Sequence, residues 1–103
     1  MSGSYSRNKG ARGEREVCNI LRAAGYDVAR SSQSDGARSP DCDGVPGIWI
    51  EVKIGKRVNV RSAWRQACND TDSREPVVVW RDDRSEWLVL CRLESWIRWV
   101  AGL

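Results

Sequence analysis

The segment GIWIEVK, residues 47–53, constrains the fold of this chain more strongly than any other part of the sequence. Successive side chains of a strand point to opposite faces of a sheet, so Ile48, Ile50 and Val52 share one face. The intervening residues share the other face: Trp49, Glu51 and Lys53. This clean alternation predicts a strand with one apolar face and with an acid and a base near its end.

The segments around this strand alternate between helical and extended patterns. Val17, Ile20 and Leu21 have the i, i+3, i+4 spacing of one helix face, which predicts a helix from about residue 12 to residue 24. Gly25 follows, where a helix C-terminus favours a left-handed residue. The other expected elements are short strands at 26–31 and 41–45, a helix at 60–69, strands at 76–80 and 87–93, and a closing helix or turn at 94–102.

The resulting order, α-β-β-β-α-β-β-α, predicts an α/β or α+β protein in which helices flank one mixed sheet. A chain of 103 residues is expected to form a single domain over 1–103. Residues 1–9 are polar and basic, so we expect a mobile basic arm there and no secretory signal. No apolar run approaches the ~18 residues of a membrane span. We therefore expect a cytoplasmic protein that does not contact a membrane.

Four cysteines and the absence of histidine narrow the chemistry that this chain can perform. The cysteines are widely spaced and include no C-x-x-C pair, so we expect buried or half-buried thiols rather than a zinc site. Cys42 is expected to pack rather than to act as a nucleophile. Catalysis without histidine must depend on carboxylates, lysine, hydroxyl groups, a thiol or a metal ion.

Asp41, Glu51 and Lys53 form a candidate site for metal-assisted hydrolysis. A hairpin would bring the two carboxylates together, and they repel each other unless a cation lies between them. Such hard oxygen ligands suit Mg²⁺, or Mn²⁺, which polarises a phosphate and activates a bound water that Lys53 would orient. Glu14 is expected to point towards the sheet and to complete the metal shell directly or through water, with Glu16 in solvent.

Each of these features also has an ordinary structural interpretation. Glu-x-Lys on a strand is often a surface ion pair, and Pro-Asp commonly starts a turn. A glutamate near a helix N-terminus commonly interacts with the helix dipole. The order of these features along the chain is more specific than any one of them.

The net charge of +3 is unevenly distributed. Residues 1–65 carry 12 Lys and Arg against 7 Asp and Glu, whereas residues 66–103 carry 5 against 7. Two basic groups would flank the candidate site and bind phosphates without reading bases, although a solvated surface is the alternative. The DNA contacts expected on these grounds are Arg7, Lys9, Arg12, Lys56, Arg57, Arg61 and Arg65. Ser31, in the serine-rich loop, is a further candidate, through a hydrogen bond to a phosphate.

The ordered motifs K-G-x-x-x-E-R-E, G-Y-D-V-A-R-S, P-D and I-E-V-K resemble the PD-(D/E)XK nucleases, and among them the archaeal-type Holliday junction resolvases and their phage relatives. This resemblance implies a restriction-endonuclease-like fold, a Mg²⁺-dependent endonuclease acting on branched DNA, and a homodimer. The catalytic set that it implies is Glu14, Asp41, Glu51 and Lys53. By the same resemblance, Arg15 and Arg30 match basic positions near the scissile phosphate, and Gln66 matches a glutamine on the second helix.

Two other functions remain open. A phage or mobile-element nuclease of the same fold would act on flaps, ends or duplex DNA, and a DNA-binding module on this fold would not cleave. No small-molecule cofactor is expected. The tryptophan-rich C-terminal third matches the family pattern poorly, and Trp96 and Trp99 are expected either in the core or in an exposed patch for a dimer partner.

Overall fold

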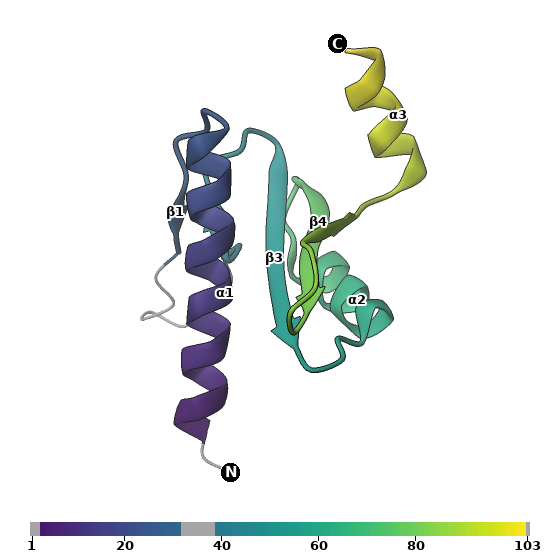
Figure 1. Cartoon of the computed structure of the whole chain (residues 1–103). Helices are drawn as coiled ribbons and strands as arrows, with labels where there is room; N and C mark the ends of the chain where they lie inside the picture. Colours follow the sequence, from purple (N-terminus) through teal and green to yellow (C-terminus); the bar gives the residue numbers. More distant parts are fainter. Residues whose placement is uncertain (1–2, 32–38, 103) are drawn as a thin grey trace.

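A computed structural model describes residues 3–31 and 39–102 of the chain (Figure 1). The elements follow the predicted order of helices and strands. In chain order they are α1 (Gly3–Ala23), β1 (Ala29–Arg30), β2 (Cys42–Asp43), β3 (Ile48–Gly55), α2 (Val60–Asp70), β4 (Glu75–Asp82), β5 (Leu88–Leu90) and α3 (Leu93–Ala101). The turn-rich loop expected at 32–38 lies outside the described residues.

The strands form one mixed sheet in the order β1-β2-β3-β4-β5. β3 and β4 are parallel and pair along their whole length, from Ile48 opposite Glu75 to Gly55 opposite Asp82. The other neighbouring pairs are antiparallel. A parallel pair needs a crossover connection, which α2 supplies between β3 and β4. β3 is the middle strand of this order, and it lies where the alternation of its sequence predicts a strand.

Helices cover both faces of this sheet (Figure 1). On one face, α1 packs against β3 through a buried cluster of Val17, Cys18, Val28, Cys42, Ile50 and Val52. On the other face, α2 packs against β4 through Ala63, Ala67 and Val78. Because Glu51 lies opposite Val78 in the ladder, Glu51 is on the α2 face, and Lys53 has the same parity.

α1 is longer at its N-terminus than the sequence predicts. It begins at Gly3, so residues 3–9, which were expected as a mobile arm, belong to the helix. Gly13 is buried, and a Cβ atom there would lie 2.9 Å from Ile54 Cγ2. The small residue therefore lets α1 lie close to β3. The helix ends before Gly25, whose φ of 105° agrees with the predicted left-handed residue.

α3 projects away from the sheet at the C-terminal end of the chain (Figure 1). Glu75, at the start of β4, anchors the polar side of α3. The Glu75 carboxylate accepts a hydrogen bond from the Ser95 hydroxyl, and its Oε1 atom lies 3.4 Å from Arg92 Nη1. The apolar side of α3 is exposed, and the exposed residues are Leu93, Trp96, Ile97 and Val100. Among the described residues, no helix has the length and apolar character needed to cross a membrane.

Candidate active site

Asp41 is held against the central strand by hydrogen bonds from its neighbours. Its backbone N–H donates to the Ile50 carbonyl at 2.8 Å, and its carbonyl accepts from the Ser31 N–H at 3.3 Å. Its side-chain Oδ2 accepts the backbone N–H of Val52 at 2.7 Å. Asp41 is only 8% exposed, so its carboxylate has a fixed position beside β3.

The environment of Asp41 disfavours its negative charge. Burial, followed by repulsion from Glu51 and Glu14, raises the pKa of Asp41 to about 7, although the Val52 hydrogen bond acts in the opposite direction. A carboxyl group with this pKa is half protonated at neutral pH. A bound cation would relieve the repulsion and favour the charged form.

We expect the metal-free protein to lose stability as the pH rises from about 4 to about 7. The folded protein keeps the Asp41 proton up to about pH 7, whereas the unfolded chain releases it near the ordinary value of 3.8. Asp41→Asn removes this penalty, so the free energy of unfolding at pH 8 should rise by on the order of 2–4 kcal/mol. Urea denaturation in a chelator at several pH values measures the effect. Asp27→Asn, at an exposed position, is the control, and an unchanged pH profile in Asp41→Asn would contradict the assignment.

Glu51, Lys53 and Gln66 form a hydrogen-bonded chain on the α2 face of the sheet. Gln66 Nε2 donates to Glu51 Oε2 at 3.1 Å, and Lys53 Nζ donates to Gln66 Oε1 at 2.9 Å. Trp49 Nε1 donates to the other Glu51 oxygen at 3.3 Å. Burial raises the pKa of Glu51, although the Trp49 bond and Lys53 oppose the shift. Gln66 thus fixes the relative positions of the acid and the amine.

Glu14 reaches the site from the helix on the opposite face of the sheet. Its carboxylate is half-buried and forms an ion pair with Arg30 on β1, with an Nε–Oε1 distance of 3.0 Å. It lies close enough to raise the pKa of both Asp41 and Glu51. Glu16, which was expected in solvent, instead lies 3.2 Å from Arg81 and accepts a hydrogen bond from Trp87 Nε1. Glu16 is thus only partly in solvent, because α1 lies beside Arg81 of β4 and Trp87 at the start of the segment leading into β5.

The carboxylates suit a hard divalent ion, but they do not form a closed cage. Within residues 3–31 and 39–102, no three His, Cys, Asp or Glu side chains are gathered closely enough to hold a metal. Mg²⁺ commonly binds one or two carboxylates and keeps several waters. Asp41 and Glu51 supply two buried carboxylates of the kind that such an ion would need, whereas the carboxylate of Glu14 is paired with Arg30.

The cysteines agree with the expectation of buried or half-buried thiols. Cys18 and Cys42 are fully buried, and Cys68 and Cys91 are partly exposed. Burial raises the pKa of the Cys42 thiol, so it is protonated and a poor nucleophile. Its side chain packs towards α1 on the face opposite Glu51, because it pairs with Ile50 in the sheet.

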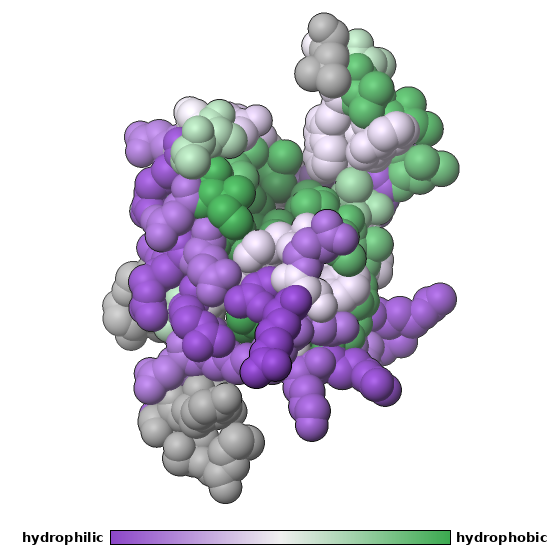
Figure 2. Space-filling model, viewed as in Figure 1, coloured by the Kyte–Doolittle hydropathy of each residue, from purple (hydrophilic) through white to green (hydrophobic). Residues whose placement is uncertain are grey.

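Most of the predicted DNA contacts lie on the surface. Figure 2 shows hydrophilic side chains over α1 and the lower part of the visible face, whereas hydrophobic ones gather over α3. Of the predicted basic contacts, those exposed are Arg7, Arg12, Arg15, Arg30, Lys56, Arg57, Arg61 and Arg65. Lys9 differs, because it is half-buried and its Nζ lies 2.7 Å from Asp83 Oδ2. Ser31 is half-buried, and its backbone N–H is bound to Asp41.

The sequence reasoning missed two polar residues at the start of α2. Asn59 and Ser62 line a pocket of about 260 Å³ together with Lys53, Arg57 and Gln66. Asn59 Oδ1 accepts the Ser62 backbone N–H at 3.0 Å, which caps the helix. Asn59 directly precedes the helix predicted at 60–69 and is followed three residues later by Ser62, and this capping pattern is the signal that could have indicated them.

The order of motifs and this geometry agree with one known family. A sequence model of the archaeal Holliday junction resolvase (hjc) family matches residues 5–93. The chain belongs to this family. Its membership identifies the chain as an endonuclease of branched DNA, and resolvase nucleases of this fold generally depend on a divalent metal. α3 extends beyond the matched range.

The structural comparison agrees with the predicted fold. The 1.6 Å structure of Hjc, a Holliday junction resolvase from the archaeal hyperthermophile Archaeoglobus fulgidus, is similar to this chain with a TM-score of 0.56. The two sequences are 22% identical, and the similarity covers 78% of this chain and 73% of that one. At this identity the likeness shows the fold, which is restriction-endonuclease-like. A comparison with curated protein sequences found no match.

Proposed function

We propose that this resolvase-family chain cleaves four-way DNA junctions with a divalent ion, Mg²⁺ or Mn²⁺, bound by Asp41 and Glu51. The observation that carries this proposal is the pair of buried carboxylates whose pKa values are raised, beside an amine held in place by Gln66. Buried acids in this state are uncommon unless a cation or a reaction requires them.

The residues around the pair have distinct roles. When bound, the ion would polarise the scissile phosphate and lower the pKa of a coordinated water. Lys53 orients the attacking water and stabilises the charge that develops on the phosphoryl oxygens. Gln66 positions Lys53 against Glu51, and Glu14 would contact a bound ion through water. Arg30 would hold Glu14 in that position.

The exposed basic residues on α1 and around the start of α2 would contact DNA backbone phosphates. Because α1 and α2 cover opposite faces of the sheet, a branched substrate could be contacted from both sides. Binding should therefore weaken as salt rises. Lys9 contributes less than its neighbours on α1, because its amine is already paired with Asp83.

A panel of DNA substrates tests the function directly. Four-way junctions, flaps and linear duplexes of the same sequences are incubated with Mg²⁺, Mn²⁺ or a chelator. We expect paired cuts near the branch point of the four-way junction, at least tenfold slower cleavage of linear duplex, and none in chelator. Preferred cleavage of flaps or ends would favour the broader nuclease alternative. Binding without cleavage under every metal condition would favour the non-catalytic module.

We also propose that the chain acts as a homodimer through α3. Paired cuts across a junction need two active sites, which a two-fold dimer supplies. The apolar side of α3 is exposed, and a groove of about 720 Å³ between α2 and the start of α3 is lined partly by Trp64, Leu90 and Leu93. A projecting apolar helix and an apolar groove on one chain are complementary in a two-fold contact between copies.

Ile97→Glu is expected to raise the dimer dissociation constant by about 100-fold or more, because it buries a charge in the apolar contact. Light scattering after size exclusion over a range of concentrations measures the change. Ile20→Glu is the matched control, since Ile20 is 52% exposed and Ile97 is 51% exposed. If Ile20→Glu dissociates the dimer and Ile97→Glu does not, the interface lies on α1 instead.

A further inference from the structure

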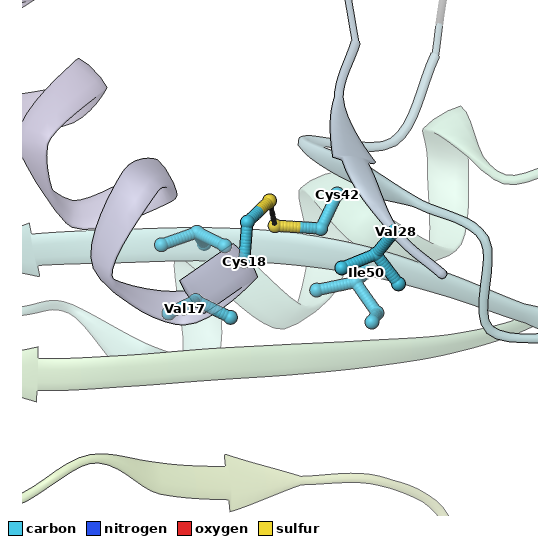
Figure 3. Close-up of a cluster of buried hydrophobic side chains, with 6 residues drawn as sticks. Val17, Cys18, Val28, Cys42 and Ile50 are labelled. Atoms are coloured by element: carbon cyan, nitrogen blue, oxygen red, sulfur yellow. Dashed lines mark hydrogen bonds between the residues drawn. The ribbon is translucent and has the colours of Figure 1, made fainter. Parts of the chain in front are cut away.

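Two buried cysteines lie in direct contact where α1 crosses the sheet (Figure 3). The Sγ atoms of Cys18 and Cys42 are 2.6 Å apart, and both residues are 0% exposed. This separation is shorter than the ~2.9 Å typical of hydrogen bonds between nitrogen and oxygen, which are smaller atoms. The two residues are free thiols in this structure, and a disulfide bond would join the same two sulfur atoms at ~2.05 Å. The two sulfur atoms lie side by side between α1 and β2 (Figure 3).

The pair joins the two chain segments that carry carboxylates of the active site. Cys42 directly follows Asp41, and Cys18 lies one helical turn after Glu14. The Cys42 thiol also lies 3.6 Å from the Glu14 carbonyl oxygen, to which it donates. Any bond between the two sulfurs therefore fixes the distance between the backbone that carries Glu14 and the backbone that carries Asp41.

We propose that Cys18 and Cys42 form a reversible disulfide that cross-links α1 to β2 behind the active site. A low-molecular-weight disulfide such as oxidised glutathione is the oxidant. One thiolate attacks it and releases one molecule of reduced thiol, and the second thiolate then attacks the mixed disulfide and releases another. The two cysteines lose two protons and two electrons in total, and the oxidant is reduced to two thiols.

The buried position of the pair determines when the exchange takes place. The oxidant cannot reach either sulfur in the closed fold, so the bond forms during folding or when α1 opens locally from the sheet. Once the disulfide has formed, the closed fold likewise keeps reducing thiols away from it. The cross-link also restricts the unfolded chain over the segment between residues 18 and 42, which stabilises the folded state.

The effect on metal binding rests on the proposed function. In the reduced protein, Glu14 and Asp41 are related through hydrogen bonds and packing alone, whereas the disulfide restrains the two segments covalently. A preorganised set of ligands binds more tightly. We expect the oxidised protein to bind Mn²⁺ about 3- to 10-fold more tightly than the reduced protein.

The test uses the full chain carrying Cys68→Ser and Cys91→Ser, so that Cys18 and Cys42 are the remaining thiols. The protein is unfolded and refolded in glutathione buffers of graded redox poise, which removes the limit that burial sets on access. Alkylation under denaturing conditions followed by intact mass then counts the free thiols, and peptide mapping identifies the linked pair. Cys42→Ser in the same background is the control.

We expect an intramolecular Cys18–Cys42 link in oxidising buffer and a melting temperature about 10 °C or more above that of the reduced protein. Two free thiols after refolding in oxidising buffer, or links between chains alone, would overturn the proposal. Calorimetric titration with Mn²⁺ separates the two claims. If the disulfide forms but the oxidised and reduced proteins bind Mn²⁺ equally tightly, the disulfide does not affect the metal site. If neither the oxidised nor the reduced protein binds Mn²⁺, the result counts against the proposed function instead.

Discussion

DNA cleavage by the Asp41→Asn and Glu51→Gln variants is expected to fall by about 10³-fold or more. Each change keeps the size of the side chain and removes the negative charge that would hold the divalent ion. In Asp41→Asn the amide oxygen could still accept the Val52 N–H, which the native carboxylate accepts at 2.7 Å, so the fold should persist. Single-turnover cleavage of a four-way junction with Mg²⁺ measures the loss.

Junction affinity separates a catalytic role from a structural one. Measured without divalent metal, the binding of both variants to the four-way junction should stay within a few-fold of the unaltered chain, because the phosphate-contacting residues are intact. Asp43→Asn is the matched control. Asp43 lies two residues after Asp41, at the end of β2, and forms an exposed ion pair with Arg74. Cleavage within tenfold of the unaltered chain in both variants would remove these two acids from the active site.

Gly44→Ala is expected to produce the largest loss of stability among single small substitutions. A Cβ atom at Gly44 would lie 2.2 Å from the Asp27 carbonyl oxygen and 2.8 Å from Val28 Cα. The φ of Gly44 is also 135°, which side chains rarely adopt. These backbone atoms cannot move without separating the segment before β1 from β2. We expect a loss of roughly 3 kcal/mol or more in the free energy of unfolding.

Gly47→Ala provides the matched comparison. Gly47 also has a positive φ, 76°, but a Cβ atom there would meet no atom within 4 Å. Its substitution should therefore cost about 1–2 kcal/mol, from the backbone conformation alone. Urea denaturation of both variants at one pH measures the difference. Equal losses would show that the close approach of the segment before β1 to Gly44 contributes nothing to stability.

The proposed metal site and the proposed disulfide require different parts of the fold. Metal binding depends on the short distance from β2 to β3, where Cys42 lies opposite Ile50 and Asp41 bonds to Ile50 and Val52. The disulfide depends on the packing of α1 over the same strands. A loss of stability from Gly44→Ala should therefore weaken both, because β1 and β2 share one edge of the sheet.

The local pattern of the sequence was sufficient to predict the order of elements and the nearest part of the site. Side-chain period identifies strands and helices without tertiary information, which is why β3 and the face that carries Glu51 and Lys53 agree with the prediction. The short connection from Asp41 to β3 likewise leaves few conformations other than antiparallel pairing. Glu14 was expected from its position on the predicted helix, and the family resemblance alone added Gln66.

Contacts between elements far apart in the chain were decided by the tertiary structure. The crossing of α2 over the sheet makes Gln66 the bridge between Glu51 and Lys53, and the path of α1 pairs Glu14 with Arg30 and Cys18 with Cys42. Periodicity tells which face of an element is apolar, but not where along its partner it packs. That position depends on the summed packing of many side chains, and here Gly13, which allows α1 to approach β3, is one of the residues that sets it.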